Sequence, residues 1–310
     1  MNMIIPSFYD ESRISTIYLP RFEAIKKEAC GIDVKSSAKD KGERVAVLLI
    51  DFQIDFCNKQ GSLYVPEAEI DISNSIQFIL KNFEKITTIY PTLDTHIAFQ
   101  IFYGLWWLDE NDTHPGPFTI ITTSDVEKGK YKPVVKPIWS LDYIKNLQTH
   151  ANKPLCIWPE HTMLGTPGHA LVPALYEICY FHSIARKSQI SFQVKGDIPE
   201  TEMYGVFSPE VKVPQSSKGG INTNLLKILG THDKIIIMGE AKSHCVLESI
   251  RQLVDFFQDQ PEVLSRIFIL EDCMSSVQHP DIDFDAIAAG EFIKFRNNGL
   301  NIVKSIDDIL

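Results

Sequence analysis

Short apolar runs alternate with longer amphipathic segments along most of the chain. The runs are rich in β-branched residues and end at turn-forming residues, which is typical of strands buried on both faces of a sheet. They lie at 45–51, 87–94, 190–195, 234–239, 266–272 and 300–305. Between them, apolar residues recur at helical spacing in 74–86, 169–187, 221–229, 245–257 and 284–296. This alternation predicts an α/β fold, namely a doubly wound, mostly parallel six-stranded sheet with helices on both faces.

Two segments do not follow this alternation. Residues 1–43 are irregular and then charged, so we interpret them as an N-terminal extension that could act as an arm for assembly. Residues 97–156 are rich in proline and aromatic residues and too apolar for a disordered segment, which indicates a folded insertion. Within it, Trp106 and Trp107 could line a lid or an interface. The sequence thus predicts one α/β domain over 44–310 that carries this insertion.

The composition narrows the class of partner. The chain has 310 residues, of which 44% are hydrophobic, and a formal net charge of −10. An acidic surface argues against a nucleic acid or an anionic membrane as partner. No apolar run approaches the roughly 18–20 residues that a membrane span requires. The start of the chain lacks the pattern of a signal peptide, and the six cysteines show no CxxC spacing, so we expect reduced thiols and a cytoplasmic location.

Three of the predicted strands lead directly to reactive side chains. The first ends at Asp51, the third ends at Lys195, and the fourth opens into a loop that carries Cys245. Ligands of open parallel sheets bind at the carboxyl ends of the strands, so an acid, an amine and a thiol could meet there. Cys245 also begins a predicted helix, where the helix dipole and a nearby lysine would lower the thiol pKa.

Each of these residues also has a plainer interpretation. A free cysteine is most often a buried apolar residue, and an aspartate at a strand end is often a turn former or a helix cap. Lys195 could be a solvated loop lysine, and Lys187 is a rival for its place. The three together indicate nucleophilic catalysis, in which Asp51 takes the proton of Cys245 beside a lysine cation.

A second set of residues has the composition of a metal site. Asp94 and His96 are two positions apart at a strand end, so their side chains point to the same face. His161 follows in a WPEH loop, and His114 in a THPGP loop is a competing ligand. One carboxylate and two imidazoles suit a divalent ion such as Zn²⁺, Fe²⁺ or Mn²⁺, zinc above all. The alternative is a surface turn and an unrelated histidine.

Aromatic residues lie near these groups in the sequence. Phe56 follows the first strand, Trp158 begins the WPEH segment, and Tyr204 and Phe207 follow the lysine strand. Flat apolar walls would suit a planar aromatic substrate, and ordinary core packing would use the same residues. His244, next to the cysteine, could join Tyr204 in the wall of such a substrate pocket.

Taken together, these stretches resemble the nicotinamidase branch of the isochorismatase-like cysteine hydrolases. The matching pieces spread over most of residues 45–275 in the order of that family, and they are VLLIDFQIDFCNKQGSLYVPEA, DTH, WPEHTMLGTPGHAL, VKG with EMYGVF downstream, and IIIMGEAKSHCV. WPEHTMLGTPG is the most specific, because it resembles the family's Trp-Pro-x-His segment followed by Gly-Thr-Pro-Gly. The loop Lys242-Ser243-His244 departs from the Thr-Asp-Tyr that family members often carry before the cysteine.

The resemblance implies roles for the reactive residues. Cys245 would be the nucleophile, Asp51 the general acid and base, and Lys195 its charged partner. The oxyanion hole would be formed by the N–H groups of Ala241 and Cys245. The family also implies a cis peptide between Glu240 and Ala241.

It further implies the ligands and the substrate contacts. The metal would be held by Asp94, His96 and His161, which favours the WPEH histidine as the third ligand. Phe56 and Trp158 fall where nicotinamidases stack the pyridine ring. A divalent metal, most simply zinc, would then be the cofactor.

The activity expected from this resemblance is hydrolysis of a small aromatic carboxamide. Nicotinamide would be converted to nicotinate and ammonia, a step of NAD salvage, by an isochorismatase-like hydrolase domain over 44–310. A related hydrolase that acts on another small amide or on an isochorismate-like enol ether is one alternative, and a catalytically silent binding or scaffold protein is another. We expect a small-molecule substrate and a homo-oligomer, with no nucleic acid or membrane as partner.

Overall fold

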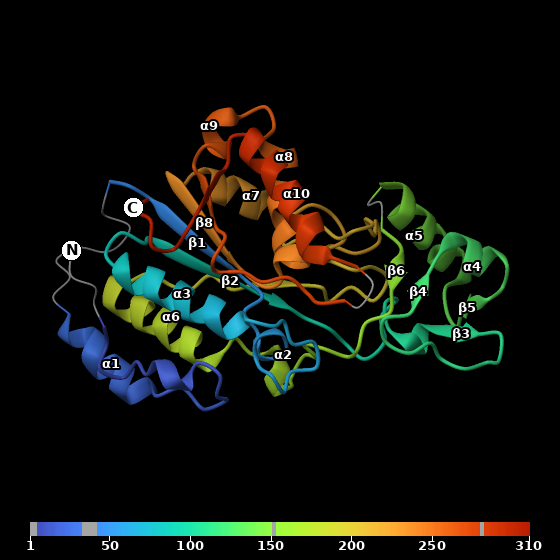
Figure 1. The fold of residues 1–310 in the computed structure, drawn as a ribbon, viewed down its shortest axis with the longest axis horizontal. Helices are drawn as coiled ribbons and strands as arrows, with labels where there is room; N and C mark the ends of the chain where they lie inside the picture. The colour runs from blue at the N-terminus through green and yellow to red at the C-terminus, as the bar shows by residue number, and fades with distance from the viewer. Residues whose placement is uncertain (1–4, 33–41, 151–152, 280–281) are drawn as a thin grey trace.

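The centre of the molecule is a parallel β-sheet (Figure 1). The computed structural model describes residues 5–32, 42–150, 153–279 and 282–310. Six strands lie in the order β10-β9-β8-β1-β2-β7, and all neighbours pair in parallel. They are β1 (Val45–Ile50), β2 (Thr88–Asp94), β7 (Gln193–Lys195), β8 (Lys234–Gly239), β9 (Ile267–Leu270) and β10 (Asn301–Val303). The predicted six-stranded sheet is confirmed.

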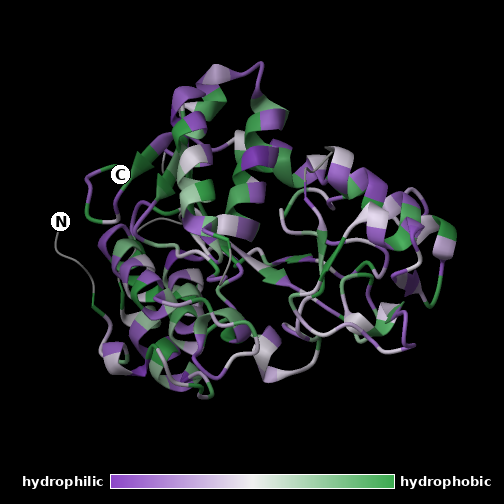
Figure 2. Cartoon of the chain, turned by 45° about the vertical axis from the view of Figure 1, so that its right-hand side comes forward, coloured by the Kyte–Doolittle hydropathy of each residue, from purple (hydrophilic) through white to green (hydrophobic). Residues whose placement is uncertain are grey.

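Helices cover both faces of this sheet (Figure 1). Because side chains of a strand alternate between faces, Val47 and Leu49 of β1 pack among residues of α1, α3 and α6, whereas Leu48 and Ile50 pack among residues of α7, α8 and α10. These helices are α1 (Phe22–Gly31), α3 (Ala68–Lys81), α6 (Pro173–Arg186), α7 (Thr223–Gly230), α8 (Leu247–Phe257) and α10 (Phe284–Asn297). Figure 2 shows them banded in polar and apolar residues, as one buried and one exposed face requires. The doubly wound arrangement is confirmed as well.

The segment 97–156 folds beside the sheet and has an apolar cluster of its own (Figure 1). It contains β3 (Trp107–Asp109), β4 (Ile120–Ile121), α4 (Thr123–Glu127), β5 (Tyr131–Pro133), α5 (Pro137–His150) and β6 (Leu155–Cys156). Strand β3 pairs with β5, and β4 pairs with β6, both in antiparallel fashion. Trp106 and Trp107 are buried within this cluster, where their indole N–H groups donate to Ser140 Oγ and Ile101 O. They are therefore core residues of the segment, and neither lines a lid or an outer surface.

The N-terminal region packs on the same chain. The guanidinium of Arg21 lies 2.5 Å from the carboxylate of Glu177 in α6, and Ile25 of α1 is fully buried. Residues 1–4 and 33–41 of the expected extension lie outside the described residues. The division of the chain into an extension over 1–43 and a domain over 44–310 stays a prediction.

Short helical turns complete the structure. They are η1 (Glu11–Arg13), α2 (Ile54–Cys57), η3 (Gly104–Trp106), η4 (Pro167–His169), a π-helical turn η5 (Lys242–Val246) and α9 (Pro261–Leu264). Among the described residues, no helix combines the length and the apolar character needed to cross a lipid bilayer.

Candidate active site

The ends of three adjacent strands bring an acid, an amine and a second acid together. Asp51 follows β1, Asp94 ends β2 and Lys195 ends β7, and these strands are neighbours in the sheet. The Lys195 ammonium lies 2.9 Å from Asp51 Oδ2 and 2.9 Å from Asp94 Oδ1. All three side chains are buried. A buried ammonium between two carboxylates stays protonated, and the two acids hold the pKa of Lys195 well above its usual value although burial opposes this.

Asp51 is fixed by its backbone and by the neighbouring strand. Its φ of 48° lies in the left-handed region, which turns the side chain away from the strand direction. Its N–H donates to Thr92 Oγ1 at 3.0 Å, and the same hydroxyl donates to Asp51 Oδ1. Burial raises the pKa of Asp51, against the lowering effect of Lys195. A carboxylate with a raised pKa is a stronger base than a solvated one, so Asp51 can take a proton from a neighbouring group and return it later in a reaction.

Cys245 reaches Lys195 and Asp51 from the segment that follows β8. It lies in η5, just before α8, and Lys195 Nζ approaches its Sγ to 3.7 Å. Burial raises the pKa of Cys245, and the opposing charge of Lys195 does not outweigh it. The sequence-based expectation of a lowered thiol pKa is therefore not met, because desolvation of the thiolate is the larger effect. A hydrogen bond to Asp51 is a further cause of the raised pKa, so the thiol proton has an acceptor in place.

The loop between β8 and η5 offers a free N–H group beside the thiol. The peptide between Glu240 and Ala241 is cis, as the resemblance implied. Among the described residues, the Ala241 N–H has no hydrogen-bond acceptor, whereas the N–H groups of Glu240 and Lys242 donate to Ile50 O and Ser275 O. Ala241 and Cys245 line the same cavity. The Ala241 N–H is therefore free to donate to a bound group, and the oxyanion hole of Ala241 and Cys245 stays a prediction.

Asp94, His96 and His161 form one compact group with the chemistry of a metal site. Asp94 Oδ2 lies 2.9 Å from His96 Nε2 and 3.7 Å from His161 Nε2. One ligand atom from each of the three residues lies within 4.8 Å of the others. Both Nδ1 atoms are engaged elsewhere, His96 with Gly196 O at 3.2 Å and His161 with Pro159 O at 2.7 Å. A proton on each Nδ1 leaves the Nε2 lone pairs for a cation, so the residues fit a divalent ion.

The charge of Asp94 and the close packing around its carboxylate are consistent with metal binding. Burial opposes ionisation of Asp94, but His96 and Lys195 hold its pKa well below the usual value. A Cβ added at Gly196, where φ is +85°, would lie 2.6 Å from Asp94 Oδ1. Glycine is required there because the backbone after Lys195 passes directly over the carboxylate. The side chain of Gln53 holds the backbone of Asp94 in place. Its amide N–H donates to Asp94 O at 2.8 Å, and its amide oxygen accepts from Asp94 N at 2.7 Å.

Replacing His96 with alanine is expected to lower the metal content of the dialysed protein. Loss of even a supporting group around a bound metal typically lowers affinity by about 10–100-fold, and loss of a ligand should do at least as much. His114→Ala is the matched control, because His114 Nδ1 lies 2.7 Å from Trp107 O and the residue is not part of the group. Metal content by elemental analysis measures this without reference to activity. Equal loss in both variants would contradict the assignment.

Aromatic rings enclose the space next to Cys245. A cavity of about 40 Å³ is lined by Phe56, Trp158, Tyr204 and His244, four of the five residues that the sequence suggested for such a wall. The fifth, Phe207, is buried in the apolar cluster with α7 and α8. The ring centroids of Trp158 and Tyr204 each lie 5.6 Å from that of His244. A flat apolar molecule would therefore meet aromatic surface on several sides.

One residue of this wall was not found from the sequence. Glu202 is buried and lines the cavity, and its Oε1 accepts from Trp158 Nε1 at 3.1 Å and from the Tyr204 hydroxyl. Its Oε2 accepts from the Tyr143 hydroxyl at 2.8 Å. The carboxyl thereby ties two pocket rings to the segment 97–156. No sequence signal marks it, because a glutamate in a polar loop is normally solvated.

Comparison with known proteins places the fold. No family model matches the chain, and no curated protein matches it. Among solved structures, the chain is similar to a nicotinamidase/pyrazinamidase of Acinetobacter baumanii, with a TM-score of 0.54, 17% identity and coverage of 86% of this chain and 98% of that one.

Two eukaryotic structures are equally similar. The yeast nicotinamidase bound to the inhibitor nicotinaldehyde matches with a TM-score of 0.56, 17% identity and coverage of 84% and 99%. An L. infantum protein in complex with nicotinate matches with a TM-score of 0.51, 17% identity and coverage of 88% and 97%. The chain thus has the isochorismatase-like fold of nicotinamidase and pyrazinamidase structures, as the motifs indicated.

Proposed function

We propose that this chain is a cysteine-dependent, metal-assisted amidohydrolase that converts nicotinamide to nicotinate and ammonia. One observation carries the proposal, namely the contact of Cys245 with Lys195 and Asp51 at the floor of an aromatic cavity. The metal-type group of Asp94, His96 and His161 supports it, because its ligand atoms lie beside the same cavity. The yeast and L. infantum structures, which hold nicotinaldehyde and nicotinate, support this choice of ring system.

The residues act in a definite order in this proposal. Asp51 accepts the thiol proton, and the thiolate of Cys245 attacks the amide carbon while its carbonyl oxygen becomes an oxyanion. The N–H groups of Ala241 and Cys245 stabilise that oxyanion, an effect of about 2.7–4 kcal/mol for each donor. Asp51 then returns the proton to the departing ammonia. In the second half it takes a proton from the water that attacks the thioester and gives it to the Cys245 sulfur as the carbon–sulfur bond breaks.

The remaining groups bind and orient. Lys195 keeps its charge throughout and holds the two carboxylates Asp51 and Asp94 at fixed distances. A divalent ion, zinc or else iron or manganese, bound by Asp94 and the two histidines would supply a Lewis-acid centre for a ring nitrogen. Phe56 and Trp158 provide the faces against which the ring stacks. A homo-oligomeric state, a place in NAD salvage and a cytoplasmic location stay predictions.

The direct test is ammonia release by the purified, metal-loaded protein from a set of carboxamides. We expect turnover of nicotinamide and pyrazinamide, and much weaker turnover of benzamide, because benzamide has the same ring size and no ring nitrogen for the metal. Hydrolysis of benzamide at the same rate would remove the proposed role of the metal. Absence of ammonia from every amide would favour a silent binding protein with this fold.

A further inference from the structure

Two buried acidic residues lie behind the loop that carries Ala241. Asp71 is on α3 and Glu240 follows β8, and their side chains are 4% and 0% exposed. Among the described residues, the charged groups with the largest effects on the two carboxyls are acids, namely Glu67 and Asp272 for Asp71, and Asp71 itself and Glu69 for Glu240. Two buried carboxylates without a cation would repel each other and would each lose their hydration. The pair therefore needs a proton.

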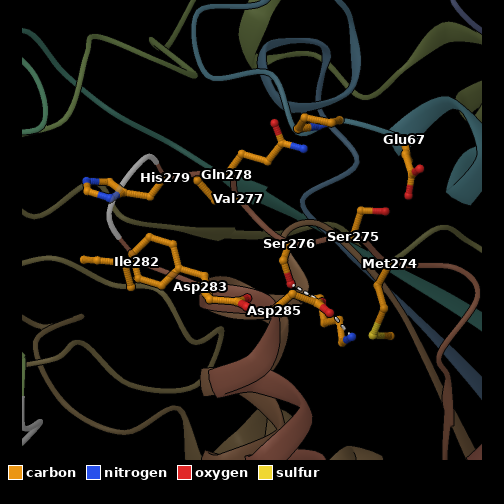
Figure 3. A pocket seen from close by; sticks show the side chains of 13 residues that line it. Glu67, Met274, Ser275, Ser276, Val277, Gln278, His279, Ile282, Asp283 and Asp285 are labelled. Atoms are coloured by element: carbon orange, nitrogen blue, oxygen red, sulfur yellow. Dashed lines mark hydrogen bonds and ion pairs between the residues drawn. The ribbon is translucent and has the colours of Figure 1, made fainter.

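Ser275 connects this pair to the backbone around Ala241. Its hydroxyl donates to Asp71 Oδ2 at 2.6 Å, and its N–H donates to Glu240 Oε2 at 3.3 Å. Its carbonyl oxygen accepts from Lys242 N at 2.8 Å. The residues on both sides of Ala241 are thus anchored to the same serine, which itself lies on the wall of a cavity of about 1000 Å³ (Figure 3).

The two carboxyl groups also act on each other at hydrogen-bond range, and Glu240 Oε1 is buried with no donor among the described residues. A hydrogen bond between them lowers the pKa of Asp71 and raises that of Glu240, while burial raises both. The pKa of Asp71 is raised to about 6, and that of Glu240 well above its usual value. A hydrogen bond between two carboxyls requires one shared proton, as in pairs of catalytic acids elsewhere.

The surroundings favour retention of this proton. Glu67, just before α3, and Asp272, after β9, act on Asp71, and Glu69 of α3 acts on Glu240. Two thiols are also close to the pair, Cys57 in α2 and Cys273 after β9, because Glu240 raises the pKa of Cys57 and Asp71 raises that of Cys273. All of these groups are acidic, so each disfavours a second negative charge on the pair.

We propose that Asp71 and Glu240 share a single proton and together position the Ala241 N–H toward the cavity at Cys245. Glu240 is then a positioning residue for the amide hydrolysis proposed above, on which this inference rests. Its side chain holds one end of the loop, and the Ser275 carbonyl holds the other. When the proton leaves at alkaline pH, repulsion between the two carboxylates displaces the loop, and kcat falls.

Two variants of Glu240 distinguish a role in positioning the Ala241 N–H from a general role in the stability of the fold. Glu240→Gln keeps a hydrogen-bond donor toward Asp71 and removes the titration, so kcat should stay within about three-fold of the parent and its alkaline decline should shift or vanish. Glu240→Leu removes the link, and kcat should fall by about 10–100-fold with little change in KM, somewhat less than loss of a whole oxyanion donor. Asp283→Asn, a change at an exposed acid on the rim of the same cavity that is not among the groups acting on the pair, is the matched control and should change neither quantity. Unchanged kcat in Glu240→Leu, or an unchanged pH profile in Glu240→Gln, would overturn the proposal.

A measurement without substrate keeps this test independent of the enzymatic activity. A group whose pKa is raised on folding stabilises the protein at low pH, and this contribution is lost as the pH rises through the folded-state pKa. The melting temperature of the parent should therefore decline more steeply than that of Glu240→Gln as the pH rises from the unfolded-state to the folded-state pKa of Glu240. At neutral pH the infrared band of protonated carboxyl groups should be stronger in the parent than in Glu240→Gln, by the contribution of one carboxyl group. If both signals are equal in the two proteins, the shared proton does not exist, whether or not the chain hydrolyses amides.

Discussion

Replacing Cys245 with alanine is expected to remove ammonia release almost completely, with kcat lowered by at least about 10⁴-fold, since loss of a catalytic nucleophile has effects of that order or larger. The reason is that no other described thiol lies at this junction of Asp51 and Lys195. A water molecule at the same place would be a poorer nucleophile toward an amide. The rate of ammonia release with saturating nicotinamide measures the effect directly.

Cys179→Ala is the control for this substitution. Cys179 is buried in α6 and packs in the apolar cluster on the other side of the sheet from α8, so its loss should leave kcat unchanged. Cys245→Ala should fold normally, because truncation of one sulfur costs about 1 kcal/mol, a typical value for a point substitution. Normal turnover by the well-folded Cys245→Ala protein would end the proposed mechanism.

The convergence of the reactive residues could be predicted from the sequence because it follows from the sheet. Parallel strands share one carboxyl edge, so residues placed directly after Ile50 and at the end of β7 had to lie there. The order of strands decided how close they came, since β2 lies between β1 and β7 and brings Asp94 to the same edge, where the Lys195 ammonium contacts both carboxylates. Local patterns do not give that order, and the sequence analysis predicted none.

Helix boundaries were predicted less well. The helix expected over 74–86 is α3 (Ala68–Lys81) in the structure, and it starts after Glu67, which has a φ of 74° and no side-chain cap. A start without a capping residue leaves no mark in the sequence. The strand expected over 190–195 is reduced to β7 (Gln193–Lys195), because it is an edge strand that pairs only with the last part of β2.

Electrostatics were the least predictable part of the site. The low pKa expected for Cys245 rested on the helix dipole and on Lys195, and burial outweighs both. Buried acids such as Glu202 and Glu240 look like surface residues in any pattern analysis, because charged residues are rarely found inside. Whether a charge is buried depends on segments far away in the sequence, here 97–156 and the loop around Ser275.

Replacing Lys195 with methionine is expected to destabilise the protein by about 3–5 kcal/mol, the usual effect of removing one partner from a buried ion pair. Methionine fills much of the same volume, so the loss is mainly electrostatic. Asp51 and Asp94 would remain buried without the ammonium that lies 2.9 Å from each. The free energy of unfolding in urea, measured at neutral pH on metal-free protein, gives the size of the effect.

Two further measurements make this prediction specific, namely the pH dependence of the stability loss and a control substitution at a surface lysine. A carboxyl whose pKa is lowered on folding, as that of Asp94 is, adds stability above its unfolded-state pKa and loses it as the pH falls. Without Lys195 this contribution shrinks, so the difference between parent and variant should be largest at neutral pH and smaller in acid. Lys218→Met, which removes an exposed ion pair with Asp197, should cost less than about 1 kcal/mol. A similar small loss for Lys195→Met would mean that the two carboxylates do not depend on the lysine, and the proposed arrangement of charges at Cys245 would have to be abandoned.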